Sequence, residues 1–419
     1  MKILTARPNR LLPECVSRIG ALERAGERVM LLVPAQTTLQ AELEILDGLK
    51  LPGSFLIDVL SPGRLQSRVF ERAGHPARTI FDERGKRMVL SAVIEEVAES
   101  LTVYRSAALS GAQGFVAKVS AILADFKRSG LTAQDLLAKA EALEDSHPAK
   151  AKLLDIARIY AGYAQRMGGE LADAEDISRE MRARLGRSGV LDGQHVFVYG
   201  FDMITPQFAA DLIAIDRHSA SLTLAIETDE NGAPDGRLFA PVNFSLTRLQ
   251  TLAQQAGVKV HRETLRRERE IADDLTAMEH RLFALGAKPF DAVPKHIALR
   301  ACSTARAEVH LAAAQLRRLA AAGESLSDMA VIYPKGSGCG ALLAGILPVY
   351  GIRAHVAEKR PALGHPLCRF VLCALAAASG GFRTADVIEC AQTGFLRLTQ
   401  QQTDALSSYA EGVDLRGDD

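Results

Sequence analysis

The chain of 419 residues has no tryptophan, only six cysteines and no net charge, because 50 Lys and Arg residues balance 50 Asp and Glu residues. A protein that holds nucleic acid by bulk charge is basic, so any nucleic-acid site here must be a local groove. Hydrophobic residues make up 48% and charged residues 24% of the sequence, as in ordinary globular proteins. At this length we expect two to three domains rather than one core.

Metal and disulfide chemistry has little support in the cysteine pattern. No CxxC pair occurs, and no histidine stands at zinc-ligand spacing from a cysteine. Cys368 and Cys373 lie five residues apart in an apolar, helix-like run, where buried free thiols are common. We therefore expect structural thiols and a reducing, cytoplasmic compartment. The six are Cys15, Cys302, Cys339, Cys368, Cys373 and Cys390.

Long hydrophobic runs are also missing. The most apolar segment, residues 371–378, falls far short of the roughly 18 uncharged residues that span a bilayer. The beginning of the sequence, MKILTARPNRLL, has neither the apolar run nor the small-residue cleavage site of a signal peptide. We expect no membrane span and no secretory signal.

The sequence does contain short apolar runs that alternate with helical patterns. Residues 28–33 (RVMLLV), flanked by glycine and proline, predict a buried strand. Residues 2–5 predict another strand, with a helix over residues 12–24 between the two, and residues 55–60 predict a third strand. This order is the βαβ start of an α/β sheet.

From about residue 82 to residue 187 the pattern changes. Apolar residues recur at spacings of three and four, which predicts an all-helical block. Strand patterns resume at residues 196–199 (VFVY) and 222–226 (LTLAI). The sequence therefore predicts a helical domain inserted into an α/β domain.

A second α/β segment is expected beyond two polar or proline-broken linkers, residues 266–270 and 288–295. It is expected to contain three strands and a helix, and to turn helical again after His365 and Pro366. The predicted strands are residues 297–301, residues 329–333 (MAVIY) and a segment that begins at Gly351, and the predicted helix is residues 305–321.

Two α/β domains, the first with a helical insertion, are the layout of a superfamily-1 helicase motor, so the sequence can be searched for an ATP site. A P-loop after the first strand needs glycines followed by Lys-Ser or Lys-Thr, whose amides and charge hold the phosphates. Here that position reads Ala6, Arg7, Pro8 and Asn9, with neither glycine nor the Lys-Ser/Thr pair. Pro8 also removes an amide donor.

The Mg²⁺-binding half of an ATPase site is missing as well. Adjacent carboxylates are needed at the end of a later strand. The strand at residues 196–198 ends instead in Tyr199, Gly200 and Phe201, followed by a lone Asp202. An aspartate in that place is more often a turn residue or a helix cap. We expect a silent motor; an active P-loop NTPase with a divergent site is the alternative.

The sequence contains VPAQTT at residues 33–38, VLSPGRL at residues 59–65 and YGFDMITPQ at residues 199–207. In this order the segments resemble AddB, the B subunit of the AddAB helicase–nucleases. The first two resemble the start of the family's sequences, and the third resembles its DGFxxFTPQ segment. The resemblance is collinear over essentially the whole chain. Further segments are GKRM (85–88), GAQGF (111–115), DFKRSGL (125–131), LDIARIY (154–160), AEV (307–309) and HPL (365–367).

The resemblance implies an α/β fold, namely an inactivated superfamily-1 (UvrD-like) helicase motor with RecA-like domains and helical insertions. It implies a first RecA-like, 1A-type domain made of residues 1–80 and 190–290, with a helical 1B-type insertion at residues 81–189. A second RecA-like, 2A-type domain would begin with residues 296–363. Residues 364–419 would begin a helical 2B-type insertion that is cut short.

In function, the resemblance implies the helicase-like N-terminal region of a subunit that processes DNA double-strand breaks for homologous recombination. The implied partners are an AddA-type subunit, which supplies the ATP-driven motor, and single-stranded and duplex-end DNA. This region would guide one strand and scan it for the Chi signal. A module that only docks its partner is the remaining alternative.

The resemblance also bears on cofactors. Family members are longer than this chain and end in a nuclease domain that carries Mg²⁺-binding carboxylates and an iron–sulfur cluster. Since the sequence stops at Asp419, we expect a fragment without that domain and without a cofactor of its own.

Residues implicated in Chi recognition in the family map onto Gln36, Thr38 and Arg64. Their amide, hydroxyl and guanidinium groups suit unstacked base edges or phosphate. From the sequence alone, Gln36 and Thr38 could equally cap the helix expected at residues 39–46, and Arg64 could pair with a local acid.

The chain departs from the family in its aromatic residues. Pro62 and Ser67 stand where some relatives carry aromatic side chains, which contribute about 1–3 kcal/mol per stacked base. Phe201 is the remaining aromatic candidate for stacking, and a buried phenylalanine at a strand end is its alternative. We expect a general single-strand path rather than the family's full Chi contact.

Overall fold

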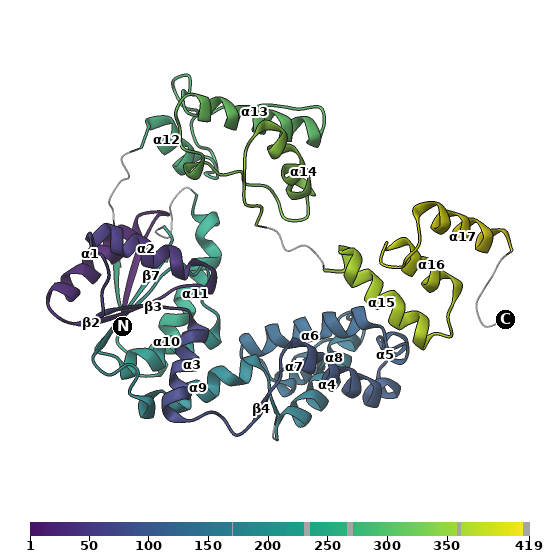
Figure 1. Cartoon of the computed structure of the whole chain (residues 1–419). Helices are drawn as coiled ribbons and strands as arrows, with labels where there is room; N and C mark the ends of the chain where they lie inside the picture. Colours follow the sequence, from purple (N-terminus) through teal and green to yellow (C-terminus); the bar gives the residue numbers. More distant parts are fainter. Residues whose placement is uncertain (170, 230–234, 266–270, 358–361, 414–419) are drawn as a thin grey trace. The chain divides into compact units, whose positions relative to one another are not determined.

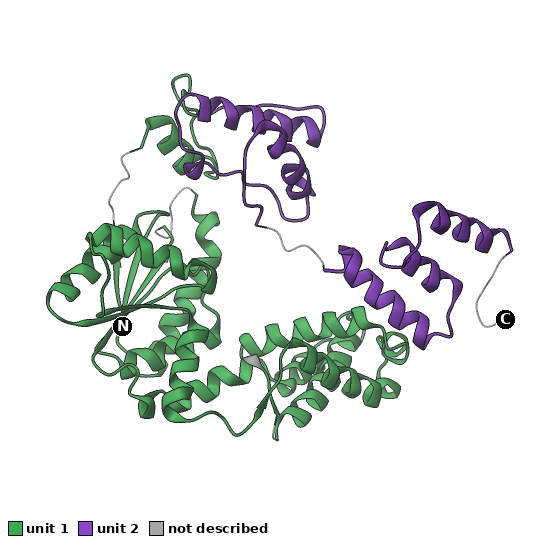
Figure 2. Cartoon of the chain, viewed as in Figure 1, with its two compact units in different colours: residues 1–297 green, residues 298–419 purple. Residues whose placement is uncertain are grey.

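A computed structural model describes the chain except for residues 170, 230–234, 266–270, 358–361 and 414–419. The linker predicted at residues 266–270 therefore lies outside the described residues. The chain forms two compact units, residues 1–297 and residues 298–419 (Figure 2). In the described part of the chain, no helix combines the length and the apolar character needed to cross a membrane.

The first unit is built on a parallel β-sheet with helices on both faces (Figure 1). The strand order is β3-β2-β6-β7-β1-β8, and every neighbouring pair runs parallel. The strands are β1 (Lys2–Ala6), β2 (Arg28–Leu32), β3 (Ile57–Leu60), β6 (Gln194–Val198), β7 (Ser221–Glu227) and β8 (His261–Thr264).

Alternate residues of each central strand enter two different cores, which is why the strands read as continuous apolar runs. Leu4, Leu31 and Phe197 pack under α1 (Leu11–Arg24) and α2 (Thr38–Leu49). Their neighbours Ile3, Met30 and Val198 pack against the opposite layer of helices. That layer consists of α3 (Pro62–Ala73), α9 (Ala174–Ser188), α10 (Pro206–His218) and α11 (Gly236–Gln255).

The chain between β3 and β6 leaves the sheet to form a helical block with its own core, which includes the buried Tyr163. A short parallel pair, β4 (Thr79–Ile80) with β5 (Leu171–Ala172), joins the segments that enter and leave this block. Its last helix, α9, contributes Met181 and Leu185 to the core under the sheet. The other helices are α4 (Glu83–Val97), α5 (Arg105–Leu109), α6 (Gln113–Arg128), α7 (Ala133–Glu141) and α8 (Lys150–Met167).

A buried carboxylate closes the loop between α4 and α5. Asp155 of α8 is fully buried and accepts hydrogen bonds from the backbone N–H groups of Thr102, Val103 and Tyr104 at 2.7–3.0 Å. These amides would otherwise be unsatisfied next to an apolar core. The first unit ends with α12 (Asp273–Arg281).

The second unit is helical, with a small core around Val309, Leu343 and Ile352. The strands predicted at residues 297–301, at residues 329–333 and from Gly351 are wrong: the described residues of this unit contain no strand. Among the described residues these runs have no neighbouring strand to pair with, as a parallel strand requires. Their side chains are not buried between helices either, since Ile332 is 95% exposed and Leu299 is 93% exposed. The helices are α13 (Ala305–Ala321), α14 (Cys339–Ile346), α15 (Pro366–Ser379), α16 (Thr384–Gln392) and α17 (Gln400–Gly412).

All six cysteines are free thiols. Cys15, Cys373 and Cys390 are buried, whereas Cys302 is exposed. The described residues contain no group of three or more His, Cys, Asp or Glu side chains arranged to hold a metal ion.

Ion pairs, as well as backbone hydrogen bonds to β1, hold the edge strand β8 in the sheet. Glu263 of β8 pairs with Arg18 of α1 and with Lys2 of β1 at 2.7 and 2.6 Å. Hydrogen bonds from Arg18 and Lys2 lower the pKa of Glu263 from 4.5 to about 2. Its contribution to stability is therefore present above about pH 4.5 and is lost as the pH falls toward 2.

We predict that Glu263→Gln lowers the free energy of unfolding at pH 7 by at most about 1 kcal/mol, since the pair is partly exposed. The difference from the unchanged chain should shrink between pH 4.5 and 2, as measured by urea denaturation at each pH. Glu95→Gln, an exposed change on α4, is the control. A difference that stays constant over this range would contradict the assignment.

Candidate functional site

Three neighbouring strands bring the sequence-predicted DNA contacts to one edge of the sheet. β3, β2 and β6 are adjacent and parallel, so their carboxyl ends meet at the same edge (Figure 1). Gln36 and Thr38 follow β2, Arg64 follows β3, and Phe201 follows β6. In parallel α/β sheets, ligands bind at this edge.

Gln36 and Thr38 do not cap α2. The helix has Thr37 at its N-cap with no side-chain hydrogen bond to the first turn. The hydroxyl of Thr38 donates to the carbonyl of Ala35 at 3.2 Å, and that of Thr37 donates to the carbonyl of Pro34 at 3.0 Å. Gln36 is exposed, and its amide has no hydrogen-bond partner among the described residues.

Arg64 stands in the first turn of α3, where its backbone N–H donates to the Ser61 hydroxyl at 3.3 Å. Its side chain is exposed and forms no ion pair with any residue that the structure describes. The nearby acid, Asp58, forms an ion pair with Arg68 instead, with 2.8 Å between Nη1 of Arg68 and Oδ2 of Asp58. The guanidinium of Arg64 is thus available to an external anion.

Phe201 is less available. Its ring lies 4.8 Å from that of Phe208, centroid to centroid, and packs against the core below the sheet. The side chain is half-buried, which matches the alternative of a strand-end core residue more closely than a free stacking surface.

The end of β1, where a P-loop would lie, holds an arginine surrounded by acids. The guanidinium of Arg7 pairs with Asp229 and with Asp235 (2.6 Å), and donates to the Glu279 carbonyl at 3.1 Å. It also lies 5.5 Å from the centre of the Phe239 ring. We call Arg7, Asp229, Asp235 and Glu279 the Arg7 cluster. The cluster fills the space beyond β1 with the protein's own ion pairs.

The charges of the Arg7 cluster depend on one another. Burial works against the charged form of Arg7, but hydrogen bonds with Asp235 and Asp229 outweigh it and raise the pKa of Arg7. The hydrogen bond from Arg7 in turn lowers the pKa of Asp235. Burial opposes ionisation of Glu279, yet hydrogen bonds from Arg10 and Arg7 hold the pKa of Glu279 below its ordinary value.

The backbone N–H of Asn9, two residues after Arg7, also has a hydrogen-bond partner within the protein. Asn9 has a left-handed backbone (φ 63°), and its N–H donates to the carboxylate of Glu227 at 2.8 Å. In a P-loop such amides point at phosphate oxygens. Here the N–H donates to the carboxylate of Glu227 instead, so a nucleotide phosphate in that place would meet negative charge.

A cavity of about 660 Å³ opens beside this point, between α1 and α2. We call it the α1–α2 cavity. Three residues from the positions that were searched for an ATP site in the sequence, Asn9, Tyr199 and Gly200, line it together with Gln40 and Glu44 of α2. No lysine or arginine is among its lining residues. No sequence pattern points to Gln40 and Glu44, because their approach to Tyr199 depends on the sheet order.

The backbone conformation at Gly200 disfavours any side chain, and the burial of Tyr199 affects its ionisation. Gly200 has φ +83°, and a Cβ there would lie 3.2 Å from Cδ of Pro34, so a side chain would be strained. Burial, with the nearby charge of Glu227, raises the pKa of Tyr199 to about 12. The phenol therefore stays protonated at any working pH.

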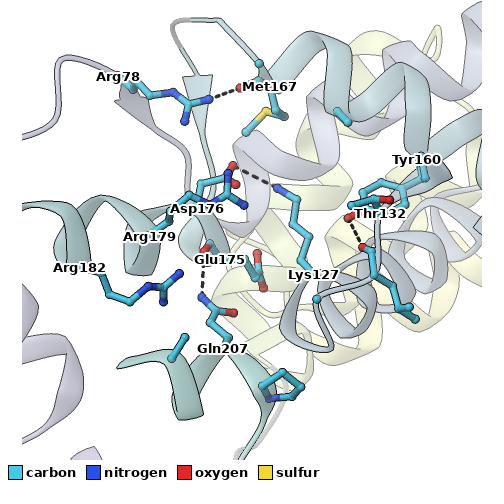
Figure 3. Close-up of a pocket in the computed structure, with 17 residues that line it drawn as sticks. Arg78, Lys127, Thr132, Tyr160, Met167, Glu175, Asp176, Arg179, Arg182 and Gln207 are labelled. Carbon is cyan, nitrogen blue, oxygen red and sulfur yellow. Dashed lines mark hydrogen bonds and ion pairs between the residues drawn. The ribbon is translucent and has the colours of Figure 1, made fainter. Parts of the chain in front are cut away.

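A second cavity, of about 540 Å³, is lined by residues of α6, α8, α9 and α10 (Figure 3). It is rich in cations, but most of them are paired. Lys127 binds Asp173 at 2.6 Å and Asp176 at 3.1 Å, and Arg182 binds Asp211. Of its four cations, Arg179 alone forms no ion pair with a described residue. The ion pairs around this cavity mainly connect α6 to the start of α9, and α9 to α10.

We predict that Arg7→Met lowers the free energy of unfolding by about 3 kcal/mol, because it removes the arginine that pairs with the buried carboxylate of Asp235. Adding Asp235→Asn should restore part of the loss, since one of the stranded charges is then removed. Denaturant unfolding at pH 7 measures both. Arg24→Met, at an exposed position of α1, is the control. Unfolding of Arg7→Met at the unchanged denaturant concentration would contradict a stabilising role for the cluster.

The chain is similar to known proteins over most of its length. The family model described as "ADDB, N-terminal" matches residues 10–279. The chain is 26% identical over 405 residues to the B subunit of the ATP-dependent helicase/deoxyribonuclease of Alkaliphilus metalliredigens, covering 94% of this chain and 35% of that protein. It is 30% identical over 423 residues to the subunit of the same name in Moorella thermoacetica, covering 97% and 36%.

A third relative of that name, from Symbiobacterium thermophilum, is 30% identical over 411 residues, covering 94% of this chain and 35% of the relative. The chain thus spans about a third of the length of the curated relatives that it matches. Because the family model covers well over half of the chain, the chain belongs to the AddB N-terminal family.

Proposed function

We propose that this chain is the helicase-like region of the B subunit of an ATP-dependent helicase/deoxyribonuclease that processes DNA double-strand breaks for recombination. In this role it guides one DNA strand without hydrolysing ATP. The observation that carries the proposal is the edge at which Gln36, Thr38 and Arg64 meet. There the Gln36 amide and the Arg64 guanidinium have no partners among the described residues. The names of the relatives support the same role.

The proposed fold is a superfamily-1 motor with its ATP site lost. A parallel sheet interrupted between β3 and β6 by a helical block supports this reading. We assign residues 1–80 and 190–290 to a 1A-type domain and residues 81–189 to a 1B-type insertion. Residues 296–363 then begin a 2A-type domain, and residues 364–419 a 2B-type insertion.

Two features support catalytic silence. The Arg7 cluster and Glu227 put protein carboxylates where a P-loop would receive phosphates. Tyr199 and Gly200 stand where the Mg²⁺-binding carboxylates would follow β6. Coulomb repulsion between these acids and a triphosphate opposes binding, and no cation lines the adjacent cavity to offset it.

The proposed strand path uses two kinds of contact. Arg64 holds a backbone phosphate, and Gln36 with Thr38 contacts bases that are unstacked at the edge. Chi scanning would be performed by the same residues. The proposed partner is an AddA-type subunit, which supplies the motor, and the DNA is single-stranded or a duplex end.

Mg²⁺ and an iron–sulfur cluster belong, in this proposal, to a nuclease domain of the whole protein. The described residues of this chain contain no group of three or more His, Cys, Asp or Glu side chains arranged to hold a metal ion.

Incubation of the chain with ATP and Mg²⁺ should release no phosphate above the buffer background, with or without single-stranded DNA. A phosphate-release assay tests this directly. Hydrolysis that Asp202→Ala abolishes would contradict the proposal and favour a divergent but active NTPase. Asp192→Ala, which changes an exposed aspartate as Asp202→Ala does, is the matched change that should have no effect in either case.

Arg64→Ala should weaken binding of a (dT) oligonucleotide roughly tenfold and lower the slope of log affinity against log salt by about 0.7, the value for one phosphate contact on a single strand. Arg72→Ala, on the same helix but two turns from the sheet edge, should leave both unchanged. Fluorescence anisotropy over a salt series measures the two quantities. Binding that Arg64→Ala does not alter would place the strand elsewhere, and no binding at any salt would favour a docking module.

A further inference from the structure

The α1–α2 cavity is not used by the proposed strand path, yet it opens at the same edge of the sheet. Its walls are apolar on the side of Leu12, Val16 and Val33 and polar on the side of Gln40 and Glu44. At about 660 Å³ it is in the size range of small-molecule sites.

The polar wall lacks positive charge. Glu44 forms no ion pair with any described residue, and the cavity is lined by neither lysine nor arginine. The backbone N–H of Asn9, which lies beside the cavity, is bound to Glu227. The cavity therefore disfavours phosphate and other anions.

The same wall presents mainly acceptors. Gln40 donates from Nε2 to Oε1 of Glu44 at 2.7 Å, which leaves the Gln40 carbonyl oxygen and Oε2 of Glu44 available. The Thr37 hydroxyl already donates to Pro34 and can only accept further bonds. A ligand that satisfies this wall must bring several N–H donors of its own.

Tyr199 adds an aromatic ring and one donor. Its hydroxyl has no hydrogen-bond partner in the part of the chain that the structure describes, and its raised pKa keeps the proton on the phenol. The ring packs in part against the core under α1 and α2, so only its part that lines the cavity is available for stacking. The hydroxyl can donate to a carbonyl oxygen.

We propose that the α1–α2 cavity binds a purine base of the guanine type, without its phosphates. Guanine is flat, carries two adjacent N–H donors that a carboxylate can accept together, and has one carbonyl oxygen that can accept from Tyr199. The base comes either from a free nucleoside or from an unstacked residue of the guided strand. The second source rests on the proposed function.

Titration calorimetry with guanosine tests the chemistry independently of DNA binding. Guanosine should bind, inosine, which lacks the second donor group, should bind more weakly, and GTP with Mg²⁺ should bind no more tightly than guanosine. Glu44→Gln should weaken guanosine binding roughly tenfold, because a charge-assisted hydrogen bond is lost. Glu42→Gln, exposed on the same helix and outside the cavity, is the matched control and should bind guanosine normally.

Tighter binding of GTP than of guanosine would overturn the inference, because it would reveal a phosphate site. Guanosine binding that Glu44→Gln leaves unchanged, or no guanosine binding at all, would also overturn it. Tyr199→Phe, a smaller change, should keep the fold and the stacking surface but lose the hydroxyl's contribution.

Oligonucleotides separate the two sources of the base. A (dT) strand that contains one dG should bind more tightly than (dT) alone, and Glu44→Gln should remove only this preference if the strand supplies the base. Guanosine binding without a dG preference assigns the site to free nucleoside. If (dT) binding depends on Arg64 while neither guanosine nor dG is recognised, this inference fails and the proposed function stands. If guanosine binds but no oligonucleotide does, the proposed function fails and the base site stands.

Discussion

The parallel hydrogen bonding of six strands is the constraint on which the rest of the first unit depends. Because neighbouring strands run in one direction, every loop that follows a strand emerges at the same edge of the sheet. Residues as distant in sequence as Asn9 and Tyr199 therefore line one cavity, and Gln36 lies at the same edge as Arg64. The side chains that lie at this edge therefore determine which ligands it can bind.

The side chains at the end of β1 differ in charge from those of a phosphate-binding site. A phosphate-binding edge offers amides and a lysine to an anion. In this chain the cation at the end of β1, Arg7, is satisfied internally by Asp229 and Asp235, and the Asn9 amide is satisfied by Glu227. Arg64 of α3, by contrast, is exposed at the end of β3 and forms no ion pair with a described residue. In our proposal, an anion is therefore attracted to the end of β3 rather than to the end of β1.

Sequence patterns predicted the elements whose neighbours are close in the chain or wholly buried. Residues 28–33 and 222–226 read as strands because both of their faces are covered, and the structure has β2 and β7 there. β8 (HRET) was missed because an edge strand of polar residues carries no apolar signal. The strands predicted in the second unit failed because an apolar run forms a strand only when another strand pairs with it.

The candidate site was predictable in part for the same reason. The family resemblance named Gln36, Thr38 and Arg64, and the strand pattern placed them after the second and third strands, where the structure has β2 and β3. Their role in binding DNA stays a prediction. The partners of Arg7 were not visible, because 222 to 272 residues separate it from Asp229, Asp235 and Glu279. Only the strand order brings these groups together, and no local pattern encodes that order.

Hydrogen–deuterium exchange of the chain with and without a (dT) oligonucleotide tests the central claim most directly, since it locates the strand without a substitution. The account predicts slowed exchange in residues 34–38 and 61–65, at the ends of β2 and β3. Residues that line the second cavity, such as 130–133, should exchange as before. Protection confined to that cavity, or absent from the sheet edge while DNA is bound, would contradict a strand path at the edge of this sheet.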